Sequence, residues 1–275
     1  MIALIDETST LKYIDSSKQS VKLPFEDIKK FQINGELLVC NLKENKIVLY
    51  NLTTNHLLFE FFYEKDKYRV SFRLTDSLLY ILVNNKLDVY SLDEYVLINS
   101  ISLERQISNF VLSPDCSVCV VYSLHEICIY DVATWELFRR IDSDKFYSDV
   151  SFIDSENIIF YSRSYNFINK CNIVTGEIYF KFKVNNSFAF DKKMIYNPRN
   201  NSVAIKIFNG VRILFLDTMF FFDYTFYRDE HLKDFMFVED KLILLFNSGS
   251  VIFLNSKTLS KVDEINDENY VCISS

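Results

Sequence analysis

The feature that most constrains this chain is a short motif that recurs about every 40 residues. In each copy, apolar residues are followed by a polar Asp, Asn or Ser, a small turn and another apolar segment. The polar residues of the seven copies are Asp15, Asn51, Ser91, Asp131, Asn172, Asp217 and Asn255. Successive copies are therefore 36, 40, 40, 41, 45 and 38 residues apart. A period of about 40 to 45 residues is typical of a four-stranded sheet repeated around a ring, and most helical solenoid repeats are shorter.

The segments within each repeat are short and apolar, and none carries a helical stripe of useful length. Continuous apolar runs occupy residues 78–83, 117–122, 157–161 and 241–246. A strand covered on one face alternates apolar and polar residues, so uninterrupted runs indicate that both faces are buried. Parallel α/β sheets also show such runs, but they need crossover helices. The sequence therefore predicts an all-β fold, a β-propeller whose four-stranded antiparallel blades cover one another.

The two ends of the chain favour seven blades in a single domain spanning residues 1–275, although six or eight blades stay open. Residues 1–25 supply only three strands, and residues 269–274 form one strand left over. We expect this C-terminal strand to join the N-terminal blade and close the ring, which hides an exposed sheet edge. Glycines support the partition, because all of them fall in predicted turns: Gly35, Gly176, Gly210 and Gly249.

Several residues resemble those of WD40-repeat propellers. Tyr-Asp, Tyr-Asn and Leu-Asp pairs stand where that family often has Trp-Asp, and Val-Leu-Ser-Pro-Asp at 111–115 resembles its Phe-Ser-Pro-Asp turn. The resemblance spans the whole chain. The family's Gly-His pair is missing from every unit, and Trp135 does not occupy the Trp-Asp position. We therefore expect a degenerate WD40-like ring that is stabilised mainly by apolar packing between blades.

Charge and cysteine use bear on compartment and partners. The net charge of −7 argues against a protein that mainly wraps nucleic acid, and basic residues such as Lys192 and Lys193 are interpreted as solvated surface. Neither a signal peptide nor a membrane span is recognisable, so we expect a soluble intracellular protein with reduced cysteines. Cys116 and Cys119 form a Cys-x-x-Cys pair without a second pair or a nearby histidine, and we expect no metal there.

The residue types that enzymes need are scarce. With four glycines, no phosphate-binding loop, dinucleotide fingerprint or nucleophile elbow can be written. His56, His125 and His231 belong to different units and are interpreted as surface residues. We therefore expect neither enzyme activity nor a cofactor. A propeller hydrolase is kept as an alternative, which a histidine beside a serine in the central channel would support.

A second alternative comes from Phe138-Arg139-Arg140, which resembles the start of the Phe-Arg-Arg-Gly motif of PROPPIN propellers. In that family the two arginines point to opposite sides of a blade and hold phosphoinositide head groups, and guanidinium groups suit phosphate oxygens. Here Ile141 replaces the glycine and the motif ends the fourth unit rather than the fifth. Ion pairs at the rim explain such arginines more simply, so we do not expect membrane lipid as the main partner.

The leading hypothesis is a non-catalytic scaffold, a subunit of an intracellular multiprotein or ribonucleoprotein complex. Its partners would be other proteins of the assembly, with contact to RNA inside a ribonucleoprotein as a further option. Fold analogy supports this reading, as do the many aromatic residues, which suit covered surfaces. The connections between blades carry aromatic and basic residues typical of interfaces. With the two arginines of the PROPPIN-like motif, the candidate interaction residues are Tyr63, Lys67, Arg105, Arg139, Arg140 and Arg228.

Overall fold

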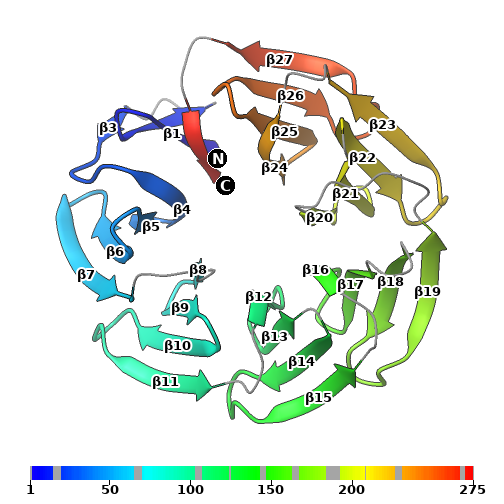
Figure 1. Ribbon diagram of the computed structural model, residues 1–275, viewed down its shortest axis with the longest axis horizontal. Helices are drawn as coiled ribbons and strands as arrows, with labels where there is room; N and C mark the ends of the chain where they lie inside the picture. The colour runs from blue at the N-terminus through cyan, green and yellow to red at the C-terminus, as the bar shows by residue number, and fades with distance from the viewer. Residues whose placement is uncertain are drawn as a thin grey trace.

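The computed structural model describes residues 2–14, 20–64, 70–102, 107–123, 125–142, 147–162, 167–183, 193–207, 209–226, 231–266 and 270–274. These residues form seven sheets of four antiparallel strands arranged in a ring (Figure 1). The described part of the chain contains no helix, and so none of the length and apolar character needed to cross a membrane. The predicted fold class, an all-β seven-bladed propeller, is therefore confirmed.

We number the blades 1 to 7 in chain order, with blade 1 containing both ends of the chain. The innermost strands are β28 (Tyr270–Ser274), β4 (Ile28–Asn34), β8 (Val70–Leu74), β12 (Ile107–Leu112), β16 (Tyr147–Phe152), β20 (Met194–Asn197) and β24 (Leu232–Val238). The second strands are β1 (Ile2–Asp6), β5 (Leu37–Leu42), β9 (Leu78–Val83), β13 (Val118–Ser123), β17 (Asn157–Ser162), β21 (Ser202–Ile207) and β25 (Lys241–Phe246).

The third and outermost strands complete each blade. The third strands are β2 (Thr10–Ile14), β6 (Lys46–Asn51), β10 (Lys86–Ser91), β14 (Glu126–Asp131), β18 (Phe167–Asn172), β22 (Gly210–Phe215) and β26 (Val251–Asn255). The outermost strands are β3 (Val21–Lys22), β7 (His56–Phe62), β11 (Leu97–Ser102), β15 (Leu137–Asp142), β19 (Ile178–Lys183), β23 (Phe221–Thr225) and β27 (Lys261–Ile265).

The hydrophobic core lies between the blades. Within the described residues, seven clusters of buried side chains each combine two neighbouring blades, including blades 7 and 1. Successive residues of a strand point to opposite faces of its sheet, and the second strands show the result. Val120 and Tyr122 of β13 pack toward blade 5, whereas Cys119 and Val121 pack toward blade 3. Burial on both faces explains why these strands are continuously apolar.

The recurring polar residue closes the turn between the third and outermost strands. Asn51 Oδ1 accepts hydrogen bonds from the backbone N–H groups of Thr53 and Thr54 at 2.9 and 2.8 Å. The same contacts recur at Asn172 and Asn255, while Asp131 accepts from the backbone N–H of Thr134. An Asx side chain that binds its own turn satisfies donors that the sheet leaves unpaired.

Blade 6 departs from this pattern, and the alignment of Asp217 with the other polar residues is wrong. In blades 4, 5 and 7 the capping residue's carbonyl accepts a bond from the N–H four positions later. In blade 6 that carbonyl belongs to Phe215, which accepts from the N–H of Met219 at 2.9 Å. Asp217 instead lies in the turn, where its carboxylate accepts from Asn201 Nδ2. Asp15 of blade 1 lies outside the described residues.

Gly210 is not a turn residue as predicted, because it begins strand β22. A Cβ atom at this position would lie 2.1 Å from the carbonyl oxygen of Tyr224 on β23. Glycine is therefore required by the close approach of the two strands rather than by turn conformation. Gly35, Gly176 and Gly249 have positive φ angles, as turn glycines commonly do.

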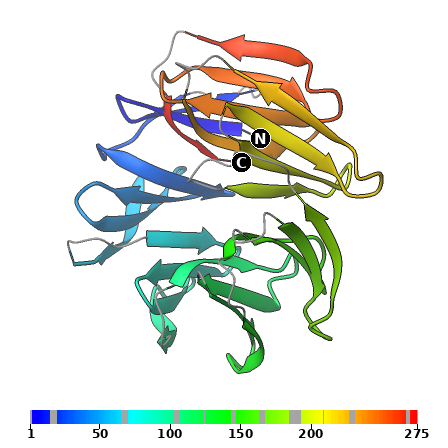
Figure 2. The ribbon, with the colours of Figure 1, turned by 45° about the vertical axis from the view of Figure 1, so that its right-hand side comes forward.

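The two ends of the described chain meet in blade 1. Strand β28 pairs antiparallel with β1, with Ala3 opposite Ser274 and Leu4 opposite Ile273. Figures 1 and 2, which differ by a 45° rotation, both place the two termini side by side. Leu4 and Ile273 also belong to the buried cluster between blades 7 and 1, so apolar packing supports this pairing.

Candidate functional site

The innermost strands carry polar residues at one repeated position. In each of four blades, a charged residue directly precedes an apolar residue that packs against the preceding blade. Since neighbouring residues of a strand point to opposite sides, these charged residues point away from that apolar cluster, at the inner edge of the blades. They are Lys30 before Phe31, Asp149 before Val150, Lys193 before Met194 and Asp234 before Phe235. We call these four residues and Arg73 of β8 the channel ring.

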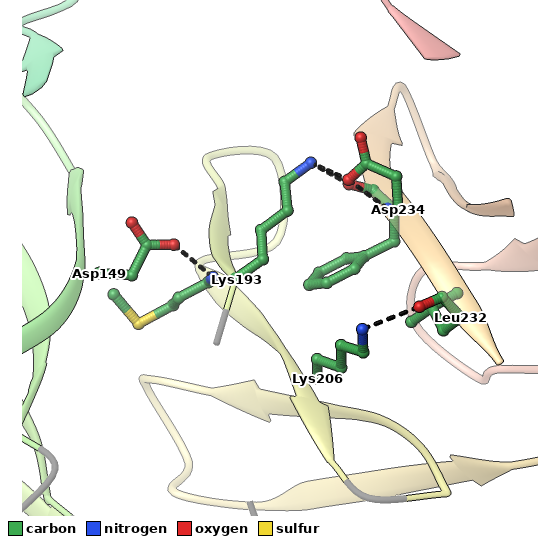
Figure 3. Close-up of polar contacts among 7 residues, drawn as sticks. Asp149, Lys193, Lys206, Leu232 and Asp234 are labelled. Carbon is green, nitrogen blue, oxygen red and sulfur yellow. Dashed lines mark hydrogen bonds and ion pairs between the residues drawn. The ribbon is translucent and has the colours of Figure 1, made fainter. Parts of the chain in front are cut away.

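Asp149 connects three blades. Its Oδ1 atom accepts a hydrogen bond from the Tyr122 hydroxyl of blade 4 at 2.6 Å and from the Val150 backbone N–H at 3.0 Å. Its Oδ2 atom accepts from the Met194 backbone N–H of blade 6 at 2.7 Å (Figure 3). Burial raises the pKa of Asp149 above its ordinary value, although these hydrogen bonds favour the charged form. A half-buried carboxylate that accepts from three donors has a structural role rather than that of a free acid or base.

Lys193 makes a comparable connection between blades 6 and 7. Its ammonium group pairs with the Asp234 carboxylate and donates to the Phe235 carbonyl oxygen at 2.8 Å (Figure 3). Lys206 of β21 donates to the Leu232 carbonyl oxygen of the same neighbouring strand at 2.8 Å. Blade 7 is therefore held at its inner edge by two lysines of blade 6.

Blades 2 and 3 are joined by a neutral side chain. The Gln32 amide donates to the Leu74 carbonyl oxygen and accepts from the Leu74 N–H, both at 3.0 Å. The amide thus pairs with β8 as a backbone peptide would. Asn34 Nδ2 adds a bond of 2.9 Å to Asp76 in the same neighbouring blade. These contacts fix the spacing of β4 and β8.

Lys30 and Arg73 differ from the rest of the channel ring. Their side chains are exposed to solvent, yet protein surrounds them closely enough to disfavour their charged forms. Desolvation, with the like charges of Arg73 and Lys193, lowers the pKa of Lys30 to about 8. Desolvation also lowers the pKa of Arg73. Among the described residues, neither side chain has a hydrogen bond or an ion pair, although the Lys30 ammonium lies 5.5 Å from the Phe72 ring centroid.

A second surface of interest lies on the rim of blade 6. Met219 and three consecutive phenylalanines are exposed there, with Phe220 at 61%. Phe220 contacts Phe222 with ring centroids 5.3 Å apart. Arg212 lies 4.2 Å from the Phe221 centroid and forms two hydrogen bonds to Asp223 of 2.6 and 2.7 Å. We call residues 219–222 the rim aromatic segment. Exposed apolar residues continue on the rims of blades 3, 4 and 5 at Val96, Leu97, Ile98, Leu137, Phe138, Ile178 and Tyr179.

Only some of the predicted interaction residues fall in the described structure. Tyr63, which follows β7, is half-buried and donates to Asn41 Oδ1 at 2.7 Å. Burial raises the pKa of this tyrosine above its ordinary value. Tyr63 therefore has an intramolecular role within blade 2, and the structure does not bring it together with the arginines of blade 4. Lys67, Arg105 and Arg228 lie outside the described residues.

The two arginines of the PROPPIN-like motif both contact protein groups. Arg139 reaches into blade 5, where it donates to the Val174 carbonyl oxygen and lies against the turn at Gly176. A Cβ atom at Gly176 would lie 2.8 Å from an Arg139 guanidinium nitrogen, so the glycine makes room for this contact. Arg140 lies 3.6 Å from the Glu126 carboxylate on the adjacent strand. Each of the two arginines therefore already has a partner within the protein.

The histidines are dispersed and surface-exposed. His56 begins β7, His125 precedes β14 and His231 precedes β24. Cys119 is buried in the cluster between blades 3 and 4, where burial raises the pKa of its thiol. In the part of the chain that the structure describes, no three His, Cys, Asp or Glu residues gather as metal ligands.

Sequence reasoning missed the channel ring. Lys193 was assigned to solvated surface because it follows Lys192 in a local basic cluster, but its ammonium group is paired with Asp234 in the next blade. A signal was present: a charged residue directly before a buried apolar residue of an inner strand occurs at 30, 149, 193 and 234. Alignment of the repeats on their inner strands, rather than on the polar turn residue, reveals it.

Comparison with known proteins does not place the chain in a family. No protein-family model matches the chain, and no curated protein matches its sequence.

Proposed function

We propose that this chain is a non-catalytic protein-interaction scaffold, a degenerate WD40-like propeller that serves as a subunit of a larger intracellular assembly. The observation that carries the proposal is the rim aromatic segment, where Met219 and three phenylalanines are exposed on one blade. Burial of an aromatic side chain in an interface stabilises a complex strongly, because about 25 cal/mol is gained for each Å² of apolar surface removed from water.

The geometry of the segment supports a protein partner. Strand β23 is the outermost strand of its sheet, so its phenylalanines project from the rim without a further strand to cover them. Arg212 and Asp223 hold the Phe221 ring from one side. Aromatic residues with an adjacent arginine are the composition found in the energetic centres of protein interfaces. Exposed apolar residues also occur on the rims of blades 3, 4 and 5, where they could extend such an interface.

The experiment compares two matched pull-downs from the native cell. Tagged wild-type protein and a Phe220→Ser, Phe222→Ser variant are purified with their partners, which are identified by mass spectrometry. We expect a defined set of proteins with the wild type and their loss with the variant. Phe62→Ser is the control, because Phe62 is 66% exposed on β7 of blade 2, on another part of the rim. The proposal fails if the wild type purifies alone, or if both variants retain the same partners.

A further inference from the structure

Two neighbouring inner strands each carry an exposed cation that forms no ion pair with another described residue. Lys30 of β4 and Arg73 of β8 belong to the channel ring, and neither has an ion pair or hydrogen bond within the described residues. We propose that Lys30 and Arg73 form a binding site for a phosphate group at the inner edge of blades 2 and 3. The site is separate from the rim aromatic segment, so it goes beyond the scaffold function.

The carboxylates of the channel ring are already engaged by other groups. Asp149 accepts hydrogen bonds from Tyr122, Val150 and Met194. Asp234 pairs with Lys193 and also accepts from the Phe235 N–H at 2.8 Å. The two acids therefore hold blades together. Their charges partly offset the repulsion at Lys30, but the pKa of Lys30 still falls to about 8. An added anion would relieve both this repulsion and the cost of desolvation.

The strands that carry the two cations are held together before any ligand arrives. The double hydrogen bond of Gln32 to Leu74 joins β4 to β8, and Lys30 and Arg73 are close neighbours of these two residues in sequence. A site whose backbone is fixed loses little conformational entropy on binding.

The chemistry of the pair favours phosphate over a carboxylate. A guanidinium group binds two phosphate oxygens with a planar pair of donors, and an ammonium group adds a compact charge. Two cations match the charge of a phosphate group, which is about −1.5 to −2 near neutral pH. A single carboxylate would neutralise only one of them. Protein around the channel lowers the local dielectric and strengthens the attraction.

The test uses the purified full chain and inorganic phosphate at pH 7.5, titrated calorimetrically at constant ionic strength with chloride as the balancing ion. Acetate and glucose 6-phosphate are titrated in parallel. We expect phosphate to bind and acetate to bind at least about tenfold more weakly, since charge-assisted hydrogen bonds contribute about 1.5–3 kcal/mol each. Equal binding by glucose 6-phosphate would identify the ligand as a phosphate monoester group, whereas its exclusion would identify free phosphate. Equal affinity for acetate and phosphate would overturn the proposal.

Substitution of the two cations tests whether they form the binding site. Lys30→Gln and Arg73→Gln should each weaken phosphate binding about tenfold or more. Lys29→Gln is the control, because Lys29 is the adjacent exposed lysine of the same strand, at a β-bulge, and it lines a different hollow with Asp6, Asp27 and Lys43. Binding that is unchanged in both channel variants, or weakened equally by Lys29→Gln, would overturn the proposal.

The pH dependence of phosphate binding by the wild-type protein is a test that needs no variant. Between pH 7.5 and 9.5 inorganic phosphate stays mainly dianionic, while Lys30 loses its proton as pH passes about 8. The charged groups that act on Lys30 are Arg73, Lys193, Asp149 and Asp234. Affinity should therefore fall steadily across this range. A constant affinity would show that Lys30 does not bind the anion.

Discussion

The centre and the rim of this ring reverse the usual distribution of polar and apolar residues. The innermost strands carry the charged channel ring, whereas the outermost strand of blade 6 exposes consecutive phenylalanines. The difference arises because the core lies between the blades, so both the centre and the rim are surfaces. At the centre, polar groups bind neighbouring blades and hold the ring together. At the rim, apolar groups lack such partners and are available to other molecules.

The largest loss of stability is expected when a buried residue of an inner strand is changed. Phe235 of β24 is 1% exposed and packs between blades 6 and 7. We expect Phe235→Ala to lower the free energy of unfolding by about 3–5 kcal/mol, through lost apolar burial and the cavity left behind. Urea unfolding followed by tryptophan fluorescence measures this, with Trp135 as the intrinsic probe. A loss below about 1 kcal/mol would contradict the assignment of the core to the spaces between blades.

Removal of the Asp149 carboxylate should have the next largest effect. Asp149→Ala leaves the Tyr122 hydroxyl and the Met194 N–H without their acceptor, so we expect a loss of about 2–3 kcal/mol in urea unfolding. Asp149→Asn keeps one acceptor oxygen and should cost less. Equal effects of the two substitutions would show that charge, rather than hydrogen bonding, is the contribution of Asp149.

The pH dependence of the free energy of unfolding tests the environment of Lys30. The pKa of Lys30 is lower in the folded protein than its ordinary value of 10.5. Between about pH 8 and that value the unfolded chain binds more protons than the folded protein, so the free energy of unfolding rises with pH. The destabilisation that comes from holding a charged Lys30 in this environment is fully present below about pH 8.

The measured quantity is the difference between wild type and Lys30→Gln, since tyrosines and cysteines titrate in the same range. In phosphate-free buffer the wild type should gain about 1 kcal/mol more than the variant from pH 7.5 to 10, an amount reduced by solvent screening of the exposed ammonium group. Parallel curves for the two proteins would contradict the desolvation of Lys30.

The smallest effect on stability is expected at the rim. Phe220→Ser combined with Phe222→Ser should change the free energy of unfolding by no more than about 0.5 kcal/mol, because exposed residues contribute little to folding. The contrast with Phe235 tests the comparison directly, since the same residue type is changed at both places. A loss above about 2 kcal/mol would show that the rim phenylalanines belong to the core.

Local patterns were sufficient to predict the strands and the blade count. Runs such as residues 241–246 are apolar because both faces are covered, and the recurring polar residue marks a turn at Asn51, Asn172 and Asn255. The alignment failed at Asp217 because a hydrophobic residue, Phe215, occupies the equivalent place in blade 6. Hydrogen bonds of the backbone define that turn, and they tolerate the loss of the side-chain cap.

The contacts between blades were harder to predict because they combine residues that are far apart in the sequence. Asp149 and Met194 lie 45 positions apart, and Lys193 and Asp234 lie 41 apart, so their contacts depend on how the blades dock. Arg139 was identified by a motif, but its contact with the Val174 carbonyl could be found only from the arrangement of blades 4 and 5. The interface role of Tyr63 stays a prediction, and its hydroxyl donates to Asn41 within blade 2, a contact that the sequence did not indicate.

The pairing of β28 with β1 has a consequence for synthesis of the protein. Ala3 and Ser274 meet in one sheet although nearly the whole described chain separates them. Contacts at such sequence separation form late, because the closure entropy of a long loop opposes them. The sheet of blade 1 thus stays incomplete on the ribosome until its last strand emerges. During translation the edges of blades 1 and 7 remain uncovered, and a chaperone that shields them would protect the nascent chain from aggregation.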